Sequence, residues 1–257
     1  MEKESRYSIA AVSRALQVLK LFDMRHRSMS LTEISERMGV SKSSILRTLE
    51  TLSEEDFLRR DPETKKYKLG MELINICNTG YEYCSVGDIA EPIMKAASER
   101  VHMVSHLAVL DGNDIIFARK TYPSNYEDSY IPASAVGSLL PVHCTGVGKV
   151  IAAFCDDEKR EELLRGCTYE RFTPATITDE ETLCRELEKI RTTGFGYNRE
   201  EHELYGTCIT CPIFNINGKL VGAVSFTDLS QRINQKDQSE LFYELKKTAE
   251  AIGNELF

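Results

Sequence analysis

The sequence has no tryptophan, only seven prolines among its 257 residues, and no long run of apolar residues. A helix that crosses a bilayer needs roughly 18 consecutive apolar residues, and no stretch of this chain comes near that length. The opening residues, MEKESRYS, are polar and charged, so they lack the apolar core of a secretory signal peptide. We therefore expect no membrane association and a cytoplasmic location.

Closely spaced cysteines are also scarce, although the chain has eight cysteines in all. Without a signal peptide we expect them to be reduced thiols. Only Cys208 and Cys211 form a Cys-x-x-Cys pair, and this spacing binds metal where a second pair accompanies it. If the segment is a strand, residues three apart lie on opposite faces. We expect neither a metal nor a cofactor, with metal binding and a thiol redox switch as the alternatives.

Negative charge is in excess over the whole chain, with a formal net charge of −8, but it is unevenly distributed. Residues 1–70 contain 14 Lys/Arg and 11 Asp/Glu, a net charge of +3. Residues 71–257 contain 18 Lys/Arg and 29 Asp/Glu, a net charge of −11. The length allows two ordinary domains. The charge division predicts that an N-terminal domain, residues 1–70, contacts nucleic acid and that the rest of the chain does not.

A helix-turn-helix is predicted over residues 31–52, LTEISERMGVSKSSILRTLETL, because its apolar residues have helical spacing on both sides of a break at Gly39. Ser30 and Glu33 have the spacing of a capping box, and Ser41 is placed to cap the second helix. A supporting helix is predicted over residues 8–23, with Ser8 as its cap. Its apolar face comprises Ile9, Val12, Leu16, Leu19 and Phe22.

A β-hairpin is predicted next, with short strands at 57–60 and 66–69 on either side of the turn Asp61-Pro62-Glu63-Thr64. Such a wing beside a recognition helix contacts phosphates, although its cations could equally be ordinary surface charge. The second helix of the motif fits a major groove, where Arg47 either reads a guanine edge or holds a phosphate. The predicted DNA-binding residues are Ser41, Lys42, Ser43, Ser44, Arg47, Thr48, Lys65 and Lys66.

The rest of the chain is predicted to be a linker helix within residues 71–87 followed by an α+β domain over residues 88–257. Hairpin turns at residues 111–114 and 217–218 favour antiparallel strands. The expected strands are 105–110, 115–120, 195–199, 206–214 and 220–227, and the expected helices are 88–101, 146–154, 156–164, 179–193 and 235–256.

Two short segments of this domain point to a binding site. Gly146 and Gly148 precede a predicted helix, where glycines allow close backbone approach and the helix N-terminus favours an anion. The alternative is a tight loop-to-helix junction. Ser225 and Thr227 are two apart on a predicted strand, so they face the same side. Glu200, Glu201 and His202 are not accompanied by a motif of catalysis, and we expect no enzyme activity and no catalytic residues.

The whole order of motifs resembles the IclR family of bacterial transcription regulators. The resemblance rests on SRALQVLKLF with the helix-turn-helix, YKLG at 67–70, LPVHCTGVGKVIAAF at 140–154, and residues 194–227. It implies a GAF/PAS-like antiparallel-sheet domain that binds a small organic effector and forms homodimers or tetramers. The matching effector positions are Gly146, Val147, Asn198, Cys208, Ser225 and Thr227.

Asn198 departs from the family's pattern, since members that sense small keto acids often have Asp there. Asn removes a negative charge and adds a hydrogen-bond donor. The predicted function is a regulator that binds a palindromic operator and responds to a small carboxylate or aromatic catabolite. The alternative is a constitutive DNA-binding protein whose C-terminal domain only oligomerises.

Overall fold

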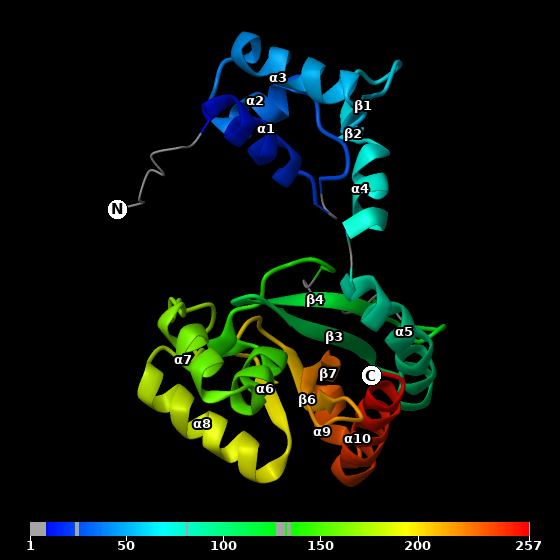
Figure 1. The fold of residues 1–257 in the computed structure, drawn as a ribbon, viewed down its shortest axis with the longest axis vertical. Helices are drawn as coiled ribbons and strands as arrows, with labels where there is room; N and C mark the ends of the chain where they lie inside the picture. Colours follow the sequence, from blue (N-terminus) through cyan, green and yellow to red (C-terminus); the bar gives the residue numbers. More distant parts are fainter. Residues whose placement is uncertain (1–8, 24–25, 81, 127–131, 133–134, 257) are drawn as a thin grey trace. The chain divides into compact units, whose positions relative to one another are not determined.

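The computed structural model describes residues 9–23, 26–80, 82–126, 132 and 135–256, with no description of the side chains in 77–85. The chain forms two compact units, Met1–Tyr81 and Glu82–Phe257 (Figure 1). The predicted cap Ser8 lies outside the described residues.

The N-terminal unit is a winged helix-turn-helix, as predicted. Ser30 and Glu33 form the expected capping box, and Gly39 ends the helix before the turn with a φ of 65°. The Ser41 hydroxyl accepts a hydrogen bond from the Ser44 N–H and so caps the recognition helix. The elements are α1 (Ala10–Lys20), α2 (Leu31–Met38), α3 (Lys42–Glu54), β1 (Leu58–Arg60), β2 (Tyr67–Leu69) and α4 (Glu72–Gly80).

The apolar face predicted for α1 is only partly correct. Ile9, Val12 and Leu16 are 67%, 54% and 54% exposed, whereas Val18 is fully buried. Leu19 and Phe22 pack against the core with Val18. Apolar residues cover more than one stripe of this helix, and periodicity does not tell which stripe meets α3.

The first helix of the C-terminal unit begins earlier than expected. The helix expected from residue 88 begins earlier, as α5 (Glu82–Val101), and runs through Pro92. The division at residues 81 and 82 falls inside the predicted 71–87 linker. Asp88 is a residue type that starts helices, but here the helical backbone already extends six residues before it.

The C-terminal unit is built on a five-stranded sheet with the strand order β4-β3-β7-β6-β5. Every neighbouring pair is antiparallel, so the predicted α+β class is confirmed. The strands are β3 (Val104–Asp111), β4 (Asp114–Thr121), β5 (Gly196–Arg199), β6 (Gly206–Phe214) and β7 (Leu220–Leu229). The helices are α5, η1 (Val142–Cys144), α6 (Gly146–Phe154), α7 (Asp157–Arg165), α8 (Glu180–Thr193), α9 (Ser230–Gln235) and α10 (Gln238–Asn254).

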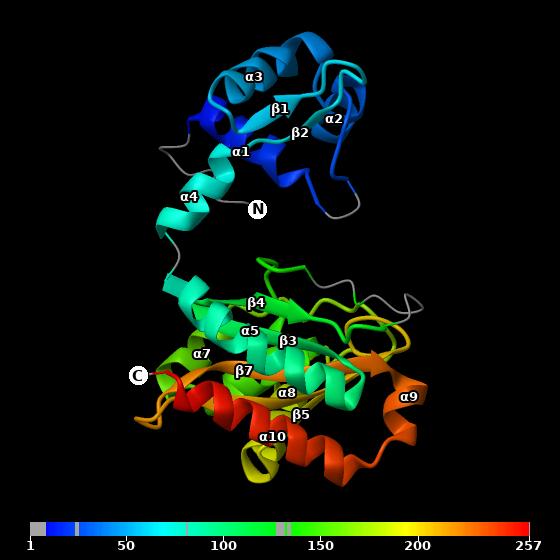
Figure 2. The same cartoon turned by 90° about the vertical axis from the view of Figure 1, so that its right-hand side faces the viewer.

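Helices cover both faces of this sheet. α5 and α10 lie along one face, and α6 and α8 lie on the other (Figures 1 and 2). Two apolar cores result, one on each face, because alternate strand residues point to opposite sides. Among the described residues, no helix is both long and apolar enough to cross a membrane.

The long C-terminal helix predicted over 235–256 is wrong at its start. α9 ends at Gln235, and α10 begins at Gln238 after Asp237, whose carboxylate accepts from the Ser239 and Glu240 N–H groups. An N-cap residue has extended backbone, so Asp237 interrupts the helix.

Candidate functional site

A cavity of about 150 Å³ lies on the α6 side of the sheet, and all six predicted effector positions line it. An engineered protein cavity of about 150 Å³ holds benzene, so this one has room for a single ring or a short organic acid. The predicted lining residues are Gly146, Val147, Asn198, Cys208, Ser225 and Thr227.

The N-terminus of α6 forms one wall. Thr145 caps the helix through a hydrogen bond from the Gly148 N–H to its Oγ1, at 3.1 Å. A Cβ at Gly146 would stand 2.5 Å from Thr210 Oγ1 and 2.6 Å from Cys208 Sγ, so only glycine brings the helix this close to β6. The first N–H groups of a helix have no partner within it, which makes this wall electropositive.

Strand register brings the polar side chains of the second wall together. Asn198 on β5 pairs with Cys208 on β6, and Cys208 pairs with Thr227 on β7. Three predicted residues therefore form one row across three strands. The Asn198 Oδ1 accepts a hydrogen bond from the Glu201 N–H at 2.7 Å. That bond uses one of the two lone pairs of Oδ1, and the amide N–H groups can donate to a ligand.

His106 on β3 lines the cavity and was missed by the sequence reasoning. It pairs with Ser225 across the sheet, and its Nδ1 lies 3.2 Å from Thr227 Oγ1. Burial lowers the pKa of His106 to about 3, so the ring is neutral at pH 7. The Phe117 ring lies 5.0 Å away and is tilted by 38°. These two rings add an aromatic wall that only strand pairing reveals.

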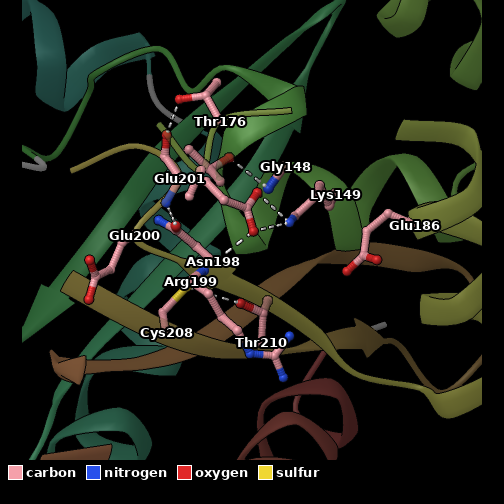
Figure 3. A network of polar contacts seen from close by, with 12 residues as sticks. Gly148, Lys149, Thr176, Glu186, Asn198, Arg199, Glu200, Glu201, Cys208 and Thr210 are labelled. Atoms are coloured by element: carbon pink, nitrogen blue, oxygen red, sulfur yellow. Dashed lines mark hydrogen bonds and ion pairs between the residues drawn. The ribbon is translucent and has the colours of Figure 1, made fainter. Parts of the chain in front are cut away.

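A buried ion pair lies behind the cavity wall, and the sequence reasoning missed it too. Lys149 on α6 is 0% exposed, and its Nζ donates to both oxygens of Glu201 at 2.6 and 2.7 Å (Figure 3). Hydrogen bonds from the hydroxyls of Thr173 and Thr176 to the backbone carbonyl of Glu201 hold the same loop. The pair joins α6 to the loop between β5 and β6, which follows Asn198 and carries His202. A lysine in an otherwise apolar helix was the one available signal.

The two cysteines of the Cys-x-x-Cys pair lie on opposite faces of the sheet, as predicted for a strand. Cys208 lines the cavity, and Cys211 belongs to the core under α10. Burial raises the pKa of both thiols, that of Cys211 to about 12. Within the described part of the chain, no group of three or more His, Cys, Asp or Glu side chains could hold a metal ion.

The predicted DNA-binding residues lie on α3 and at the wing of the N-terminal unit. Arg47 is exposed, and Thr48 is half-buried. Lys65 is exposed at the wing turn, where its Nζ donates to the Pro62 carbonyl at 2.6 Å. All eight residues have accessible side chains, since six of them are exposed and Lys66 and Thr48 are half-buried.

Comparisons with known proteins cover almost the whole chain. The family model for the bacterial transcriptional regulator IclR C-terminal domain matches residues 82–254, and that for the IclR helix-turn-helix domain matches residues 11–62. The chain is 31% identical to the HTH-type transcriptional regulator XynR of Escherichia coli K12, over 96% of this chain and 97% of that protein.

Solved structures of IclR proteins are also similar to this chain over almost its whole length. The Thermotoga maritima IclR structure aligns with a TM-score of 0.76 at 28% identity, covering 95% of this chain and 98% of that one. An IclR homolog from Microbacterium hydrocarbonoxydans complexed with 4-hydroxybenzoate aligns with a TM-score of 0.79 at 25% identity, with the same coverage.

A winged helix-turn-helix joined to an antiparallel-sheet domain, with a cavity lined by polar and apolar side chains, defines a DNA-binding transcription regulator. This chain belongs to the IclR family of bacterial transcriptional regulators. Members of the family regulate transcription and are not enzymes.

Proposed function

We propose that this protein is a ligand-responsive regulator whose C-terminal unit binds a small carboxylate, aromatic or aliphatic. The single observation that carries the proposal is the convergence of Gly146, Val147, Asn198, Cys208, Ser225 and Thr227 on one cavity of about 150 Å³. These residues come from four separate elements, and a merely structural core would be filled by apolar side chains instead.

The hydrogen-bond donors in the cavity lining, which also includes Glu203, support an anion as the ligand. The α6 N-terminus, the Asn198 amide and the hydroxyls of Ser225 and Thr227 can all donate hydrogen bonds. Phe117 and His106 supply an apolar, aromatic surface beside them. The Microbacterium homolog was solved with 4-hydroxybenzoate, whose size and carboxylate fit these features, so aromatic acids are the first ligands to test.

A thermal shift screen of small carboxylates tests the effector role. We expect at least one acid to raise the melting temperature and its amide to have less effect, because only the acid uses the electropositive wall. Ser225→Ala should abolish the shift, whereas Ser239→Ala, at an exposed position on α10, should leave it unchanged. A screen without any stabilising acid would favour the alternative, a constitutive DNA-binding protein whose C-terminal unit only oligomerises.

We further propose that the N-terminal unit reads a palindromic operator as part of a homodimer or tetramer in the cytoplasm. One small module makes few base contacts, and two-fold symmetric copies read two half-sites. The exposed apolar residues of α1 and of α4, such as Leu16 and Ile74, are suited to cover one another between copies.

Arg47→Ala tests base reading by the recognition helix. The exposed guanidinium can take a guanine edge, which is worth roughly 1–3 kcal/mol of discrimination. We expect the variant to lose more affinity for the operator than for random DNA in a binding titration at fixed salt. Equal losses on both DNAs would leave Arg47 with a phosphate contact only.

A further inference from the structure

Cys167 and His143 form a thiol–imidazole pair outside the cavity. The Cys167 Sγ lies 3.2 Å from Nδ1 of His143, and Nε2 of the same ring lies 2.9 Å from the backbone carbonyl oxygen of Glu170. Neither side chain lines the effector cavity. The proposed function uses neither of them.

The carbonyl of Glu170 determines which ring nitrogen carries the proton. A carbonyl oxygen only accepts hydrogen bonds, so Nε2 of the neutral ring is the protonated nitrogen. Nδ1 then has a lone pair directed at Cys167, and the thiol is the donor in the 3.2 Å contact. A nucleophile, a base and a group that orients the base are therefore aligned, which is the arrangement of an activated nucleophile.

Burial distinguishes this pair from the other thiols. His143 is 1% exposed, and the rings of Tyr169 and Phe172 lie 5.7 and 6.1 Å from it. Cys167 is half-buried, so this residue is partly accessible to solvent. Among the cysteines whose side chains the structure describes, Cys184 is exposed and Cys144, Cys155, Cys208 and Cys211 are buried. Of these six thiols, Cys167 alone combines access with an adjacent imidazole.

We propose that Cys167 is a base-activated thiol that small uncharged hydroperoxides oxidise to a sulfenic acid. His143 Nδ1 takes the thiol proton, and the thiolate sulfur attacks the distal oxygen of the peroxide. An S–O bond forms and the O–O bond breaks. The sulfur is oxidised to S–OH, the peroxide is reduced to an alcohol or water, and the proton returns from the imidazolium to the leaving oxygen.

The environment of Cys167 explains why the thiol needs His143 as a base and offers a hydrogen-bond donor for the oxygen of the sulfenic acid. Burial raises the pKa of the Cys167 thiol, so without a proton acceptor this thiol would form less thiolate than an exposed cysteine. The buried Tyr169 hydroxyl has no hydrogen-bond partner among the described atoms. Burial, and to a lesser extent Cys167, raise the pKa of that phenol, which keeps it protonated and able to donate a hydrogen bond.

The place of the pair in the fold gives the oxidation a consequence. His143 lies in η1, directly before Thr145 and Gly146 at the α6 N-terminus. An oxygen added to Cys167 would displace the sulfur from His143 and act on the segment that leads into the effector cavity. Oxidation of Cys167 would thus be a second signal, besides effector binding, to which the C-terminal unit responds.

Peptide mass spectrometry on the reduced full-length protein tests the proposal. The protein is treated with hydrogen peroxide at pH 7 with dimedone present throughout, and the rates of sulfenic acid trapping at Cys167 and Cys184 are compared. The matched variant is His143→Gln, whose side-chain amide can still donate to the Glu170 carbonyl but has no basic nitrogen. Cys167→Ser verifies the assignment of the modified peptide.

We expect Cys167 to be trapped at least ten times faster than Cys184, and its rate to fall about tenfold in His143→Gln with Cys184 unchanged. Equal rates at the two cysteines of the wild-type protein would overturn the proposal, and this comparison does not depend on the folding of any variant. An undiminished Cys167 rate in a His143→Gln protein with a normal melting curve would overturn it as well.

Discussion

At the scale of single residues, contacts on several sides limit what each cavity position can be. A Cβ at Gly146 would clash with the side chains of Thr210 and Cys208, and His106, which burial keeps neutral, lies against Phe117 and Thr227. Both constraints arise from neighbours that are distant in the sequence. Each leads to a measurable expectation for one side chain.

Gly146→Ala should close the cavity wall and destabilise the fold. The added methyl group must displace the buried side chains of Thr210 and Cys208, and overpacking of this kind costs roughly 1–3 kcal/mol of unfolding free energy. Denaturant melts measure the loss, and acids that stabilise the wild-type protein should no longer do so. The control is Gly166→Ala, where the nearest atom, Glu162 O, would lie 3.5 Å from the new Cβ. The prediction is refuted if Gly146→Ala keeps the stability of the wild-type protein while Gly166→Ala loses stability.

His106 should make the protein less stable as the pH falls below 6.5. Its folded pKa is about 3 against an ordinary value of 6.5, so between these values the unfolded chain binds a proton that the folded chain does not. The contribution of His106 to the free energy of unfolding is fully present above pH 6.5 and is lost progressively as the pH falls toward 3. From pH 7.5 to 5.5 the loss is about 1 kcal/mol.

Urea melts of the wild-type protein and of His106→Asn at pH 7.5 and 5.5 measure this contribution. His202, whose pKa burial also lowers, acts in the same direction in both proteins and cancels in the comparison. An identical pH dependence in the two proteins would contradict a buried neutral His106.

At the scale of elements, the ion pair Lys149–Glu201 ties α6 to the loop between β5 and β6. The two residues are 52 positions apart in the chain, and Figure 3 shows how the loop is held around them. Removal of one partner leaves an uncompensated buried charge, whereas removal of both does not. The pair therefore matters for the position of the two cavity walls rather than for net stability.

Lys149→Met alone should lower the unfolding free energy by roughly 3–5 kcal/mol. The double variant Lys149→Met, Glu201→Leu should recover most of that loss, because neither charge remains buried. Arg185→Met serves as the control, since Arg185 and Glu181 are exposed and such a pair contributes at most about 1 kcal/mol. Denaturant melts of the wild-type protein, Lys149→Met, Glu201→Leu and the double variant give the coupling free energy, and simple additivity of the two single losses would refute it.

At the scale of the whole molecule, α1 has a stripe of apolar side chains that no other part of the described chain covers. Ile9, Val12 and Leu16 are each more than half exposed, although a DNA-binding module of this size gains nothing from apolar surface in water. Association with a second copy would cover it. The division of charge, +3 in residues 1–70 and −11 in residues 71–257, leads us to expect that DNA contact is confined to the N-terminal unit.

Leu16→Glu should weaken self-association and, with it, operator binding. The position is exposed, so the fold of the single unit should persist. Gln17→Glu adds the same charge at the neighbouring exposed position and should change neither property. Sedimentation velocity and operator titration measure the two effects. A Leu16→Glu protein that associates and binds DNA like the wild type would exclude α1 from the interface.

Local signals in the sequence account for most of the elements. Ser30, Glu33, Gly39 and Ser41 act through neighbours three or four residues away, and the structure confirms each of them. The start of α10 was misplaced because Asp237 is also a polar residue that could lie on the surface of a helix. The α1 face was misjudged because burial depends on which element packs against it.

The sequence by itself determined the winged helix-turn-helix, the antiparallel α+β domain and the six positions that face the cavity. Periodicity, capping and turn residues are local, and the resemblance to the family supplied the positions of the site. Only the tertiary structure brought His106 and Phe117 to that site, buried Lys149 against Glu201 and set Cys167 on His143. Those contacts join residues between 11 and 121 positions apart, and no local pattern encodes which distant side chains will meet.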